Sequence, residues 1–290
     1  MPRIALATYA KLPTLNDDDR LLIPALAALG VTAVPAVWDS AAVCWNEFQG
    51  VLIRSSWDYH LRPLEFLDWI ARLERGGGRV WNPGPLLRWN HHKRYLRDLA
   101  AGGGGGVATV PTRWLARGEA ADLASLLGDA GWREAVIKPA ISASAFGTWR
   151  SSTETASRDQ SRLEELLSAG DVMVQPLLSE VGDAGEWSLV FLGGSFSHAV
   201  LKRPAPGDYR VQWEFGGSAV SATPPGAVQA DAERVIAAVP DALYARVDGV
   251  ERDGRLVLME LELIEPHLFL GWDSGSAGRL AGRLRAALAR

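Results

Sequence analysis

The stretch RLVLMELELIEP, residues 255–266, decides the fold, because it combines a strongly apolar run with glutamates at 260, 262 and 265. Side chains alternate between the two faces of a strand. One face would carry Leu256, Leu258, Glu260, Glu262 and Ile264, and the other Val257, Met259, Leu261 and Leu263. Apolar residues on both faces predict a strand covered on both sides. Two carboxylates then lie half inside the protein.

A bare buried carboxylate costs several kcal/mol or loses its charge, so a cation must meet these groups. The segment YARVDGV (244–250) is a second strand, expected to form a hairpin with 255–263 around Glu251–Gly254. This hairpin would bring Asp248 toward Glu260. Three oxygen ligands without a nearby Cys or His suit Mg²⁺ or Mn²⁺ better than zinc. Ion pairing with Arg246 or Arg255 is the alternative, and the segment alone leaves both open.

Composition excludes several classes of protein. The chain has 290 residues, enough for two or three subdomains with a core. A net charge of −4 argues against a general nucleic-acid binder. No apolar run reaches the length of about 18 residues that a membrane span needs, and the N-terminus lacks the pattern of a signal peptide. Cys44 is the single cysteine, which excludes an internal disulfide and a cysteine-based metal cluster. We expect a cytoplasmic protein.

The first 105 residues alternate between strand and helix patterns. Strands are expected at 4–8 and within VTAVPAVW (31–38) and GVLIRSSW (50–57), and helices at 17–30, 63–75 and 91–101, with RVWNP (79–83) between the last two helices. This alternation predicts an α/β protein that begins with a parallel, doubly wound sheet. The run AAGGGGG (100–106) is the best linker, because glycines make regular structure costly.

The pattern of strands and helices differs in the rest of the chain. After residue 106 come strand patterns at EAVIKP (134–139) and DVMVQPLL (171–178) and helix patterns at 119–130 and 160–169. Residues 185–222 are typical of antiparallel strands broken by Gly and Pro, and are followed by a helix at 227–239, the hairpin and a C-terminal helix from about 274. We expect three units, at 1–105, 106–176 and 177–290.

Lysine is rare in this chain, since only four of the 30 basic residues are lysines. Lys138 ends the strand EAVIKP just before the small-residue loop 141–147, whose backbone N–H groups can cradle a phosphate. Lys202 ends the strand HAVLK. A lysine at a strand end is ordinarily a surface residue whose stem covers apolar groups. Both interpretations stay open on these residues alone.

Two further segments are candidates for substrate binding. In LIRSSWDYH, Arg54 follows a strand at the edge where parallel sheets bind ligands, and its guanidinium can fork onto a carboxylate. Trp57, Asp58 and Tyr59 could line the same pocket, or the segment could be a surface loop with a packed tryptophan. In GDYRVQWEFGGSA, Arg210, Gly217 and Ser218 raise the same choice.

The order of these motifs resembles the ATP-grasp superfamily, in particular the branch of the glutathione synthetases and cycloserine synthetases. The resemblance covers nearly the whole chain. It is carried by WNPGPLLRWNHHKRYL, AVIKP with its small-residue loop, VMVQPLL, GEWSLVF, LKRPAPGDYRVQWEFGG, RVDGV and MELELIEP. It implies an N-terminal Rossmann-like substrate domain (1–105), a small lid (106–176) and a C-terminal catalytic domain (177–290), with ATP between the last two.

The resemblance also implies roles for individual residues. Phosphates would be contacted by Lys93 and Lys138, and the loop carrying Ser142, Ser144 and Gly147 would close over them. The nucleoside would be held by Gln175, Leu178 and Glu186. The γ-phosphate and the activated carboxylate would face Lys202 and Arg210, with Arg54 as a further catalytic residue, and Mg²⁺ or Mn²⁺ would bind Asp248, Glu260 and Glu262. Many family members carry Asn where this chain has Glu262, so the third carboxylate is a departure from the pattern.

The activity that the resemblance implies is carboxylate–amine ligation through an acyl phosphate. The first expectation is the intramolecular cyclisation of O-ureido-D-serine to D-cycloserine. The alternatives are an intermolecular amino-acid or peptide ligase and a non-catalytic ATP-binding protein. The expected partner is a small amino-acid-like molecule, without nucleic acid or membrane. The exact substrate, its stereochemistry, the number of metal ions and the oligomeric state, a homo-oligomer included, stay open.

Overall fold

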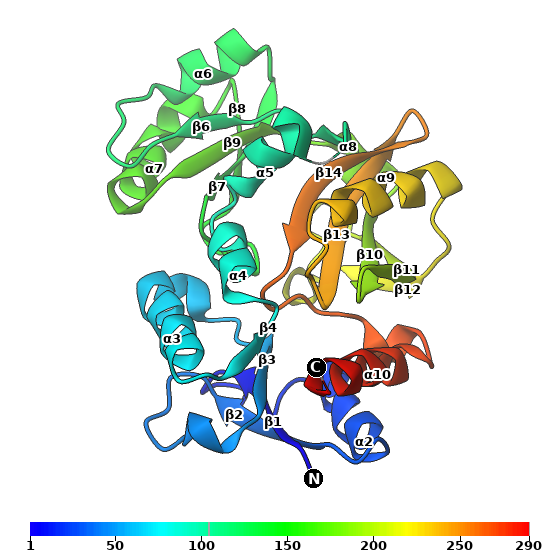
Figure 1. The fold of residues 1–290 in the computed structure, drawn as a ribbon. Helices are drawn as coiled ribbons and strands as arrows, with labels where there is room; N and C mark the ends of the chain where they lie inside the picture. The colour runs from blue at the N-terminus through cyan, green and yellow to red at the C-terminus, as the bar shows by residue number, and fades with distance from the viewer. Residues whose placement is uncertain (104, 290) are drawn as a thin grey trace.

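The computed structural model describes residues 1–103 and 105–289, and its strands form three sheets (Figure 1). The first sheet has the strand order β2-β1-β3-β4, and every pair in it is parallel. Its strands are β1 (Arg3–Thr8), β2 (Thr32–Val37), β3 (Gly50–Ser55) and β4 (Arg79–Trp81). On β1, Ile4 and Leu6 face one core and Ala5 and Ala7 face another. The sheet is therefore covered on both sides, which confirms the predicted doubly wound arrangement.

Two helices expected in this part of the chain are interrupted. The helices are α1 (Asp17–Arg20), α2 (Leu22–Ala27), α3 (Pro63–Arg75), α4 (Gly84–Asn90) and α5 (Tyr95–Asp98). The predicted helix 17–30 breaks at Leu21, because Pro24 has no N–H to bond the carbonyl of Arg20 and its ring clashes there. The predicted helix 91–101 is wrong over its first turn, where the Lys93 N–H bonds to Ala140 O instead.

The linker prediction covers a segment that is partly helical. Residues Leu99–Gly103 follow α5 and are kinked at Gly102, whose φ of 117° is a backbone conformation that glycine adopts without strain. Gly104 lies outside the described residues. The chain then enters β5 (Ala108–Thr109), which pairs in parallel with the strand of the opening stretch.

The second sheet is antiparallel in each of its strand pairs and has the order β6-β9-β7-β8. Its strands are β6 (Arg113–Leu115), β7 (Glu134–Pro139), β8 (Trp149–Ser152) and β9 (Val172–Pro176), and its helices are α6 (Leu123–Ala130) and α7 (Ala156–Ala169). Asp122 caps α6 by accepting the Ser125 N–H. Leu123, Leu127, Leu163 and Leu167 pack against the sheet in a core of their own.

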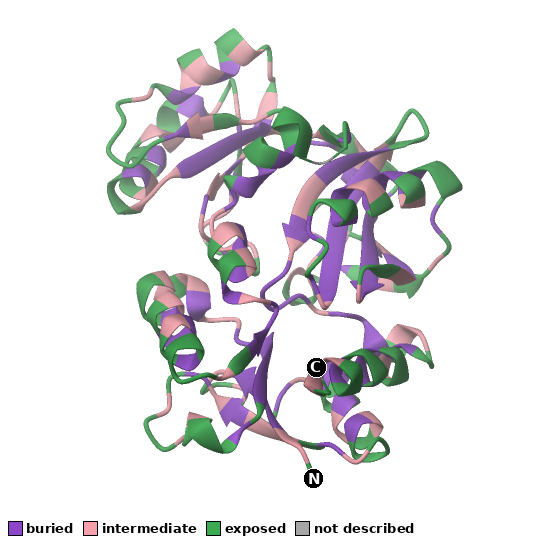
Figure 2. Ribbon diagram, in the orientation of Figure 1, coloured by how far each residue is buried: buried purple, intermediate pink, exposed green. Residues whose placement is uncertain are grey.

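The third sheet has the order β12-β11-β10-β13-β14-β5. The remaining elements are α8 (Ser179–Asp183), β10 (Glu186–Leu192), β11 (Ser195–Arg203), β12 (Ser218–Ser221), α9 (Gly226–Ala237), β13 (Tyr244–Arg252), β14 (Arg255–Glu262) and α10 (Ser276–Leu288). Figure 2 shows its central strands buried, with exposed residues along the outer sides of the helices. The C-terminal helix α10 returns to the first sheet and lies beside α2, where Leu280 and Leu284 meet Leu22 and Leu26 (Figure 1).

The predicted hairpin of β13 and β14 is present. Asp253 and Gly254 form its two-residue turn, both with positive φ (52° and 73°), as expected of a primed hairpin turn. Asp248 pairs with Glu260, as the sequence predicts.

The predicted sharing of faces along β14 is wrong, because a bulge shifts the register between Asp248 and Gly249. Leu256 and Leu258 pack in the same core as Leu261 and Leu263, and not on the face of the glutamates. Gly249 allows the close approach, since a Cβ there would lie 2.5 Å from Val257 O. The bulge thus turns the glutamates toward the opposite face from the leucines.

Within residues 1–103 and 105–289, no helix is both long and apolar enough to cross a membrane. The divisions expected at residues 105 and 176 stay predictions. They lie close to the starts of β5 and α8, where the chain passes from one sheet to the next.

Candidate active site

One face of the third sheet carries the charged residues, because each of them occupies a cross-strand pair on that face. Glu186 on β10 pairs with Lys202 on β11, and Ser188 pairs with Asp248 on β13. Asp248 pairs in turn with Glu260 on β14. The opposite face is apolar and packs against α9. The pattern of the strands thus gathers lysine, arginine and carboxylate side chains at the floor of a pocket.

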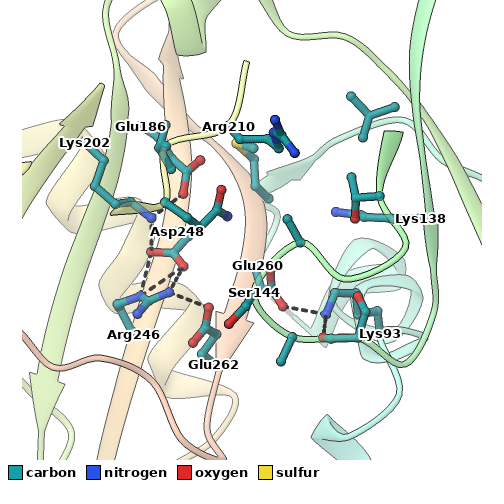
Figure 3. Close-up of a pocket in the computed structure, with 18 of the residues that line it drawn as sticks. Lys93, Lys138, Ser144, Glu186, Lys202, Arg210, Arg246, Asp248, Glu260 and Glu262 are labelled. Atoms are coloured by element: carbon teal, nitrogen blue, oxygen red, sulfur yellow. Dashed lines mark hydrogen bonds and ion pairs between the residues drawn. The ribbon is translucent and has the colours of Figure 1, made fainter. Parts of the chain in front are cut away.

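A chain of ion pairs runs across this floor (Figure 3). Lys202 Nζ lies 2.5 Å from Glu186 Oε1 and 3.6 Å from Asp248 Oδ1. Arg246 lies 2.8 Å from Asp248 Oδ2 through Nη2 and also pairs with Glu262. The Ser188 hydroxyl donates to Asp248. The alternative of ion pairing with Arg246 therefore holds for Asp248 and Glu262, whereas Arg255 pairs with Asp231.

Lys93 pairs with Glu260 from the other side of the pocket. Its Nζ lies 2.8 Å from Glu260 Oε1 and donates to the Ser142 carbonyl at 2.9 Å. Lys93 is 7% exposed, so it depends on these partners in place of water. Glu260 and Glu262 thus have their cations, and 28% of the Glu260 side chain and 26% of the Glu262 side chain stay exposed. Both glutamates line the pocket.

The segment around Lys93 also completes the edge of β14. β5 pairs with β14 only at Val257 and Leu258. Beyond that point, Asn90 donates to Leu261 O at 2.8 Å and accepts the Leu263 N–H at 3.0 Å, while the Tyr95 hydroxyl accepts the Leu261 N–H. These side chains replace a neighbouring strand. They fix Lys93 beside Glu260.

Lys138 and the loop after it line the pocket on the same side as Lys93, which donates to the Ser142 carbonyl of that loop. Among the residues described, no carboxylate lies within ion-pair distance of Lys138. Burial lowers its pKa, an effect that Glu260 partly offsets and Lys93 reinforces. Ser142 and Ser144 line the pocket, and Gly147 (φ = 67°) turns the loop close to Pro139 without lining it. A half-buried lysine that lines a pocket without a carboxylate partner offers its ammonium group to an anion.

The carboxylates differ in their protonation. Burial raises the pKa of Asp248, but Arg246 and Lys202 outweigh it and hold the pKa at about 2. The pKa of Glu262 is raised to about 7, mainly by burial and further by Asp248 and Glu260, against the pull of Arg246. The pKa of Glu260 is lowered, because Lys93 and Lys138 overcome the effect of burial. The positive charge around Glu262 therefore does not fully offset the effect of burial and of the neighbouring carboxylates.

This donor set fits a divalent cation in its chemistry. Asp248, Glu260 and Glu262 offer carboxylate oxygens, which Mg²⁺ and Mn²⁺ prefer, and the raised pKa of Glu262 marks a place for added positive charge. Within the described part of the chain, no three acidic, His or Cys side chains already stand at metal-binding distances from one another. The carboxylates face Arg246 and Lys93 instead, so an ion would have to compete with these pairs.

All three predicted nucleoside residues, Gln175, Leu178 and Glu186, line the pocket. Gln175 and Leu178 line it beside Met259, and Leu178 belongs to an apolar cluster with Val110 and Val211. Gln175 Nε2 donates to Thr112 Oγ1 at 2.8 Å. An apolar slot with a few fixed polar groups is the usual form of a site for a flat ring.

Arg210 lines the same pocket from the segment after β11. Asp208 holds its guanidinium at 2.8 Å, and the guanidinium lies over the ring of Phe215 at 3.5 Å. These two contacts fix its direction. Gly217 and Ser218 do not line the pocket; a Cβ at Gly217 would lie 2.0 Å from Val211 O, so this glycine allows the chain to approach itself closely.

Of the four residues predicted to bind substrate in the segment 54–59, two line the pocket and two do not. Trp57 and Tyr59 line the pocket. Arg54 does not, which is against the expectation of a fork onto a substrate carboxylate. It is fully buried, and Asp19 already takes its Nε at 2.8 Å. Asp58 pairs with Arg62 at 3.0 Å outside the pocket lining.

Sequence reasoning missed several pocket residues. Arg246 entered it only as an alternative partner for the acids, although its place two residues before Asp248 on one strand puts both on one face. Asn90 and Tyr95 lay within a quoted motif without a role. Glu265 and His267 line the pocket from the segment after β14. No periodicity could reveal them, because the strand ends at Glu262.

Comparisons of the sequence and the structure with known proteins all point to cycloserine synthetases. A family model described as "D-cycloserine synthetase DcsG, N-terminal domain" matches residues 4–82. The chain is 33% identical over 97% of both chains to the cycloserine biosynthesis protein DcsG of Streptomyces lavendulae. It resembles the crystal structure of D-cycloserine synthetase DcsG with a TM-score of 0.88, at 30% identity and 99% coverage of both chains.

A more distantly related structure has a similar fold. The D-alanine–D-alanine ligase of Bacillus anthracis complexed with ATP matches with a TM-score of 0.68, at 16% identity over 99% of both chains. This similarity shows the ATP-grasp fold alone, and the fold predicted from the motifs is confirmed. Together with the identity to DcsG along the whole chain, it makes the protein a ligase of this class. The chain belongs to the family of ATP-grasp ligases that includes DcsG.

Proposed function

We propose that this ligase uses ATP to cyclise O-ureido-D-serine to D-cycloserine through an acyl phosphate. The full-length likeness to the cycloserine relatives carries the proposal. The pocket supports it, because lysines, an oriented arginine and a row of carboxylates line one cavity. Cationic side chains and metal-binding carboxylates of this kind stabilise the charge on a phosphoryl group as it is transferred to a carboxylate.

Lys93, Lys138 and Lys202 are proposed to contact the phosphates of ATP. Lys138 is the most direct case, because it lines the pocket without a carboxylate partner among the described residues. The loop with Ser142, Ser144 and Gly147 would close over the phosphates and exclude water, which protects an acyl phosphate from hydrolysis. The nucleoside would lie against Gln175 and Leu178, with Glu186 toward the ribose.

Asp248, Glu260 and Glu262 are proposed to hold Mg²⁺ or Mn²⁺. When bound, the ion supplies positive charge that neutralises the triphosphate and the developing charge in the transition state. The protein's own contribution is to orient these oxygens: Ser188 and Arg246 fix Asp248, and Lys93 fixes Glu260.

The chemistry proceeds in two substitutions and a hydrolysis. A carboxylate oxygen of the substrate attacks the γ-phosphorus, and the bond to ADP breaks. The oxygen-bound ureido nitrogen then attacks the carbonyl carbon. A C–N bond forms, its proton leaves, and the C–O bond to phosphate breaks, which closes a five-membered ring. Water removes the carbamoyl group as CO₂ and NH₃. Lys202 and Arg210 would stabilise the charge on the transferring phosphoryl group.

The test is ADP release by the purified protein with Mg²⁺ and ATP against a panel of substrates. The panel contains O-ureido-D-serine, its L-enantiomer, and single amino acids with and without a second amine. ADP release with O-ureido-D-serine alone, with a cyclic product by mass spectrometry, is the expected result. Release only with two amino compounds would replace the proposal by intermolecular ligation, and ATP binding without any release would replace it by a non-catalytic role.

A further inference from the structure

Glu265 is a pocket carboxyl without a counter-ion. It is 8% exposed and lines the same cavity as the ion pairs of the floor. Over residues 1–103 and 105–289, no Lys, Arg or His nitrogen lies within 4.0 Å of its oxygens. Burial raises its pKa well above the ordinary value, and Glu262 adds to this while Lys93 opposes it. A buried carboxylate in this situation is stabilised by any cation that the pocket receives.

The other buried carboxylates of the pocket are already paired. Lys202 holds Glu186, Lys93 holds Glu260, and Arg246 holds both Asp248 and Glu262. Glu214 also lines the pocket but is exposed to solvent, where an ion pair contributes little. Glu265 is therefore the buried carboxyl most available for a ligand.

Glu265 lies where the pocket meets the N-terminal unit. The chain leaves β14 after Glu262 and enters the N-terminal unit, where Ile264 joins the core of the first sheet. Trp57 Nε1 donates to the carbonyl of Glu265 at 3.2 Å. The apolar slot proposed for the nucleoside is lined by Gln175 and Leu178, which belong to a different sheet and its following loop.

We infer that the Glu265 carboxylate binds the α-ammonium group of the amino-acid substrate. The inference rests on the proposed function, because the α-ammonium is the one cation that O-ureido-D-serine carries, and its ureido group is neutral. A charge-assisted hydrogen bond to a side chain that is largely excluded from water is strong and directional. It would hold the amino acid with its carboxylate toward the lysines and would reject acids that lack an amino group. Glu265 is thus a specificity-determining residue.

The test removes each partner of this contact in turn. The substrates are O-ureido-D-serine and 3-(ureidooxy)propanoate, which lacks only the amino group. The proteins are the wild type, Glu265→Gln, Glu265→Asp and the control Glu47→Gln, an exposed carboxylate that pairs with Arg3 far along the chain. Steady-state ADP release gives kcat/KM for each pair, and KM for ATP reports on the nucleotide end.

Loss of the amino group should lower the wild-type kcat/KM by about 30-fold or more, as for the truncation of a desolvated charge pair. E265Q should lower kcat/KM for O-ureido-D-serine by a similar factor, leave KM for ATP unchanged, and bring the ratio of the two substrates to within about threefold of one. E265D should keep part of the discrimination, and E47Q all of it.

Two results would overturn the inference while leaving the proposed function intact. The first is equal turnover of both substrates by the wild type, which needs no variant to fold. The second is an undiminished substrate ratio in E265Q. Absence of ADP release from the wild type with every amino-bearing substrate would overturn the proposed function and, with it, the inference.

Discussion

Replacing Glu262 by glutamine should stabilise the ligand-free protein at and above neutral pH. The pKa of Glu262 is raised from its ordinary value of 4.5 to about 7. Between these values, the folded protein binds a proton that the unfolded chain has released. The contribution of Glu262 to the free energy of unfolding therefore falls as the pH rises from about 4.5 to about 7. A glutamine side chain carries no charge, so the variant lacks this loss.

The magnitude follows from the size of the shift. A difference of 7 − 4.5 = 2.5 units corresponds to about 3.4 kcal/mol at about 1.36 kcal/mol per unit. This is an upper bound, because 26% of the side chain stays exposed. Arg246 can keep a hydrogen bond to the amide oxygen, although without the attraction of the charge. We expect E262Q to be more stable than the wild type by about 1–3 kcal/mol at pH 8 and equally stable at pH 4.5.

Urea unfolding of both proteins at several pH values from 4.5 to 8, without nucleotide or divalent ions, measures this difference. Glu260→Gln is the matched control of opposite sign. The pKa of Glu260 is lowered, mainly by Lys93, so E260Q should be less stable than the wild type above pH 4.5 by about 1–3 kcal/mol. A gap for E262Q that does not grow from pH 4.5 to 8, or a variant less stable than the wild type at pH 8, would refute the reasoning.

Further changes test other parts of the site. E260Q should also abolish turnover while the protein stays folded by circular dichroism; unchanged ADP release would remove Glu260 from the metal site. Lys138→Met should raise the Kd for ATP at least about tenfold without lowering the urea midpoint, because Lys138 is half-buried in the pocket and has no carboxylate partner among the described residues; an unchanged Kd by calorimetry would contradict this. Gly249→Ala should destabilise the protein by about 1–3 kcal/mol and lower kcat, since its Cβ would meet Val257 O at 2.5 Å; wild-type values for both would show that the bulge is dispensable. Tyr244→Phe should lower stability by about 1–3 kcal/mol, because the hydroxyl lies 2.7–3.1 Å from three buried carbonyls; an unchanged urea midpoint would contradict this.

The fold was predictable where local signals agree. The hairpin of β13 and β14 follows from two apolar runs around Asp253–Gly254, and the parallel first sheet from alternating strand and helix patterns. The helix breaks were predictable only in part. Pro24 is a visible cause of the first break, whereas the bond from Lys93 N to Ala140 O depends on a residue more than 40 positions along the chain, just after β7.

The site shows the same limit. Strand alternation predicted half-buried carboxylates at 260 and 262, and the resemblance named the lysines that line the pocket. The bulge at Gly249 reversed the leucines relative to these glutamates, because it inserts one residue that no periodicity announces. Arg54 looked free in the sequence, but its partner Asp19 comes from a helix that folds back onto the strand end. Burial of Glu265 likewise depends on contacts between distant segments.

Carboxylate activation by phosphoryl transfer is the central claim, and an isotope transfer measures it most directly. O-Ureido-D-serine labelled with ¹⁸O in its carboxylate is converted with Mg²⁺ and ATP, without any other amine. The account predicts one ¹⁸O in each inorganic phosphate released, together with a cyclic product that retains the other. Unlabelled phosphate, with both labelled oxygens left in the amino acid, would contradict it.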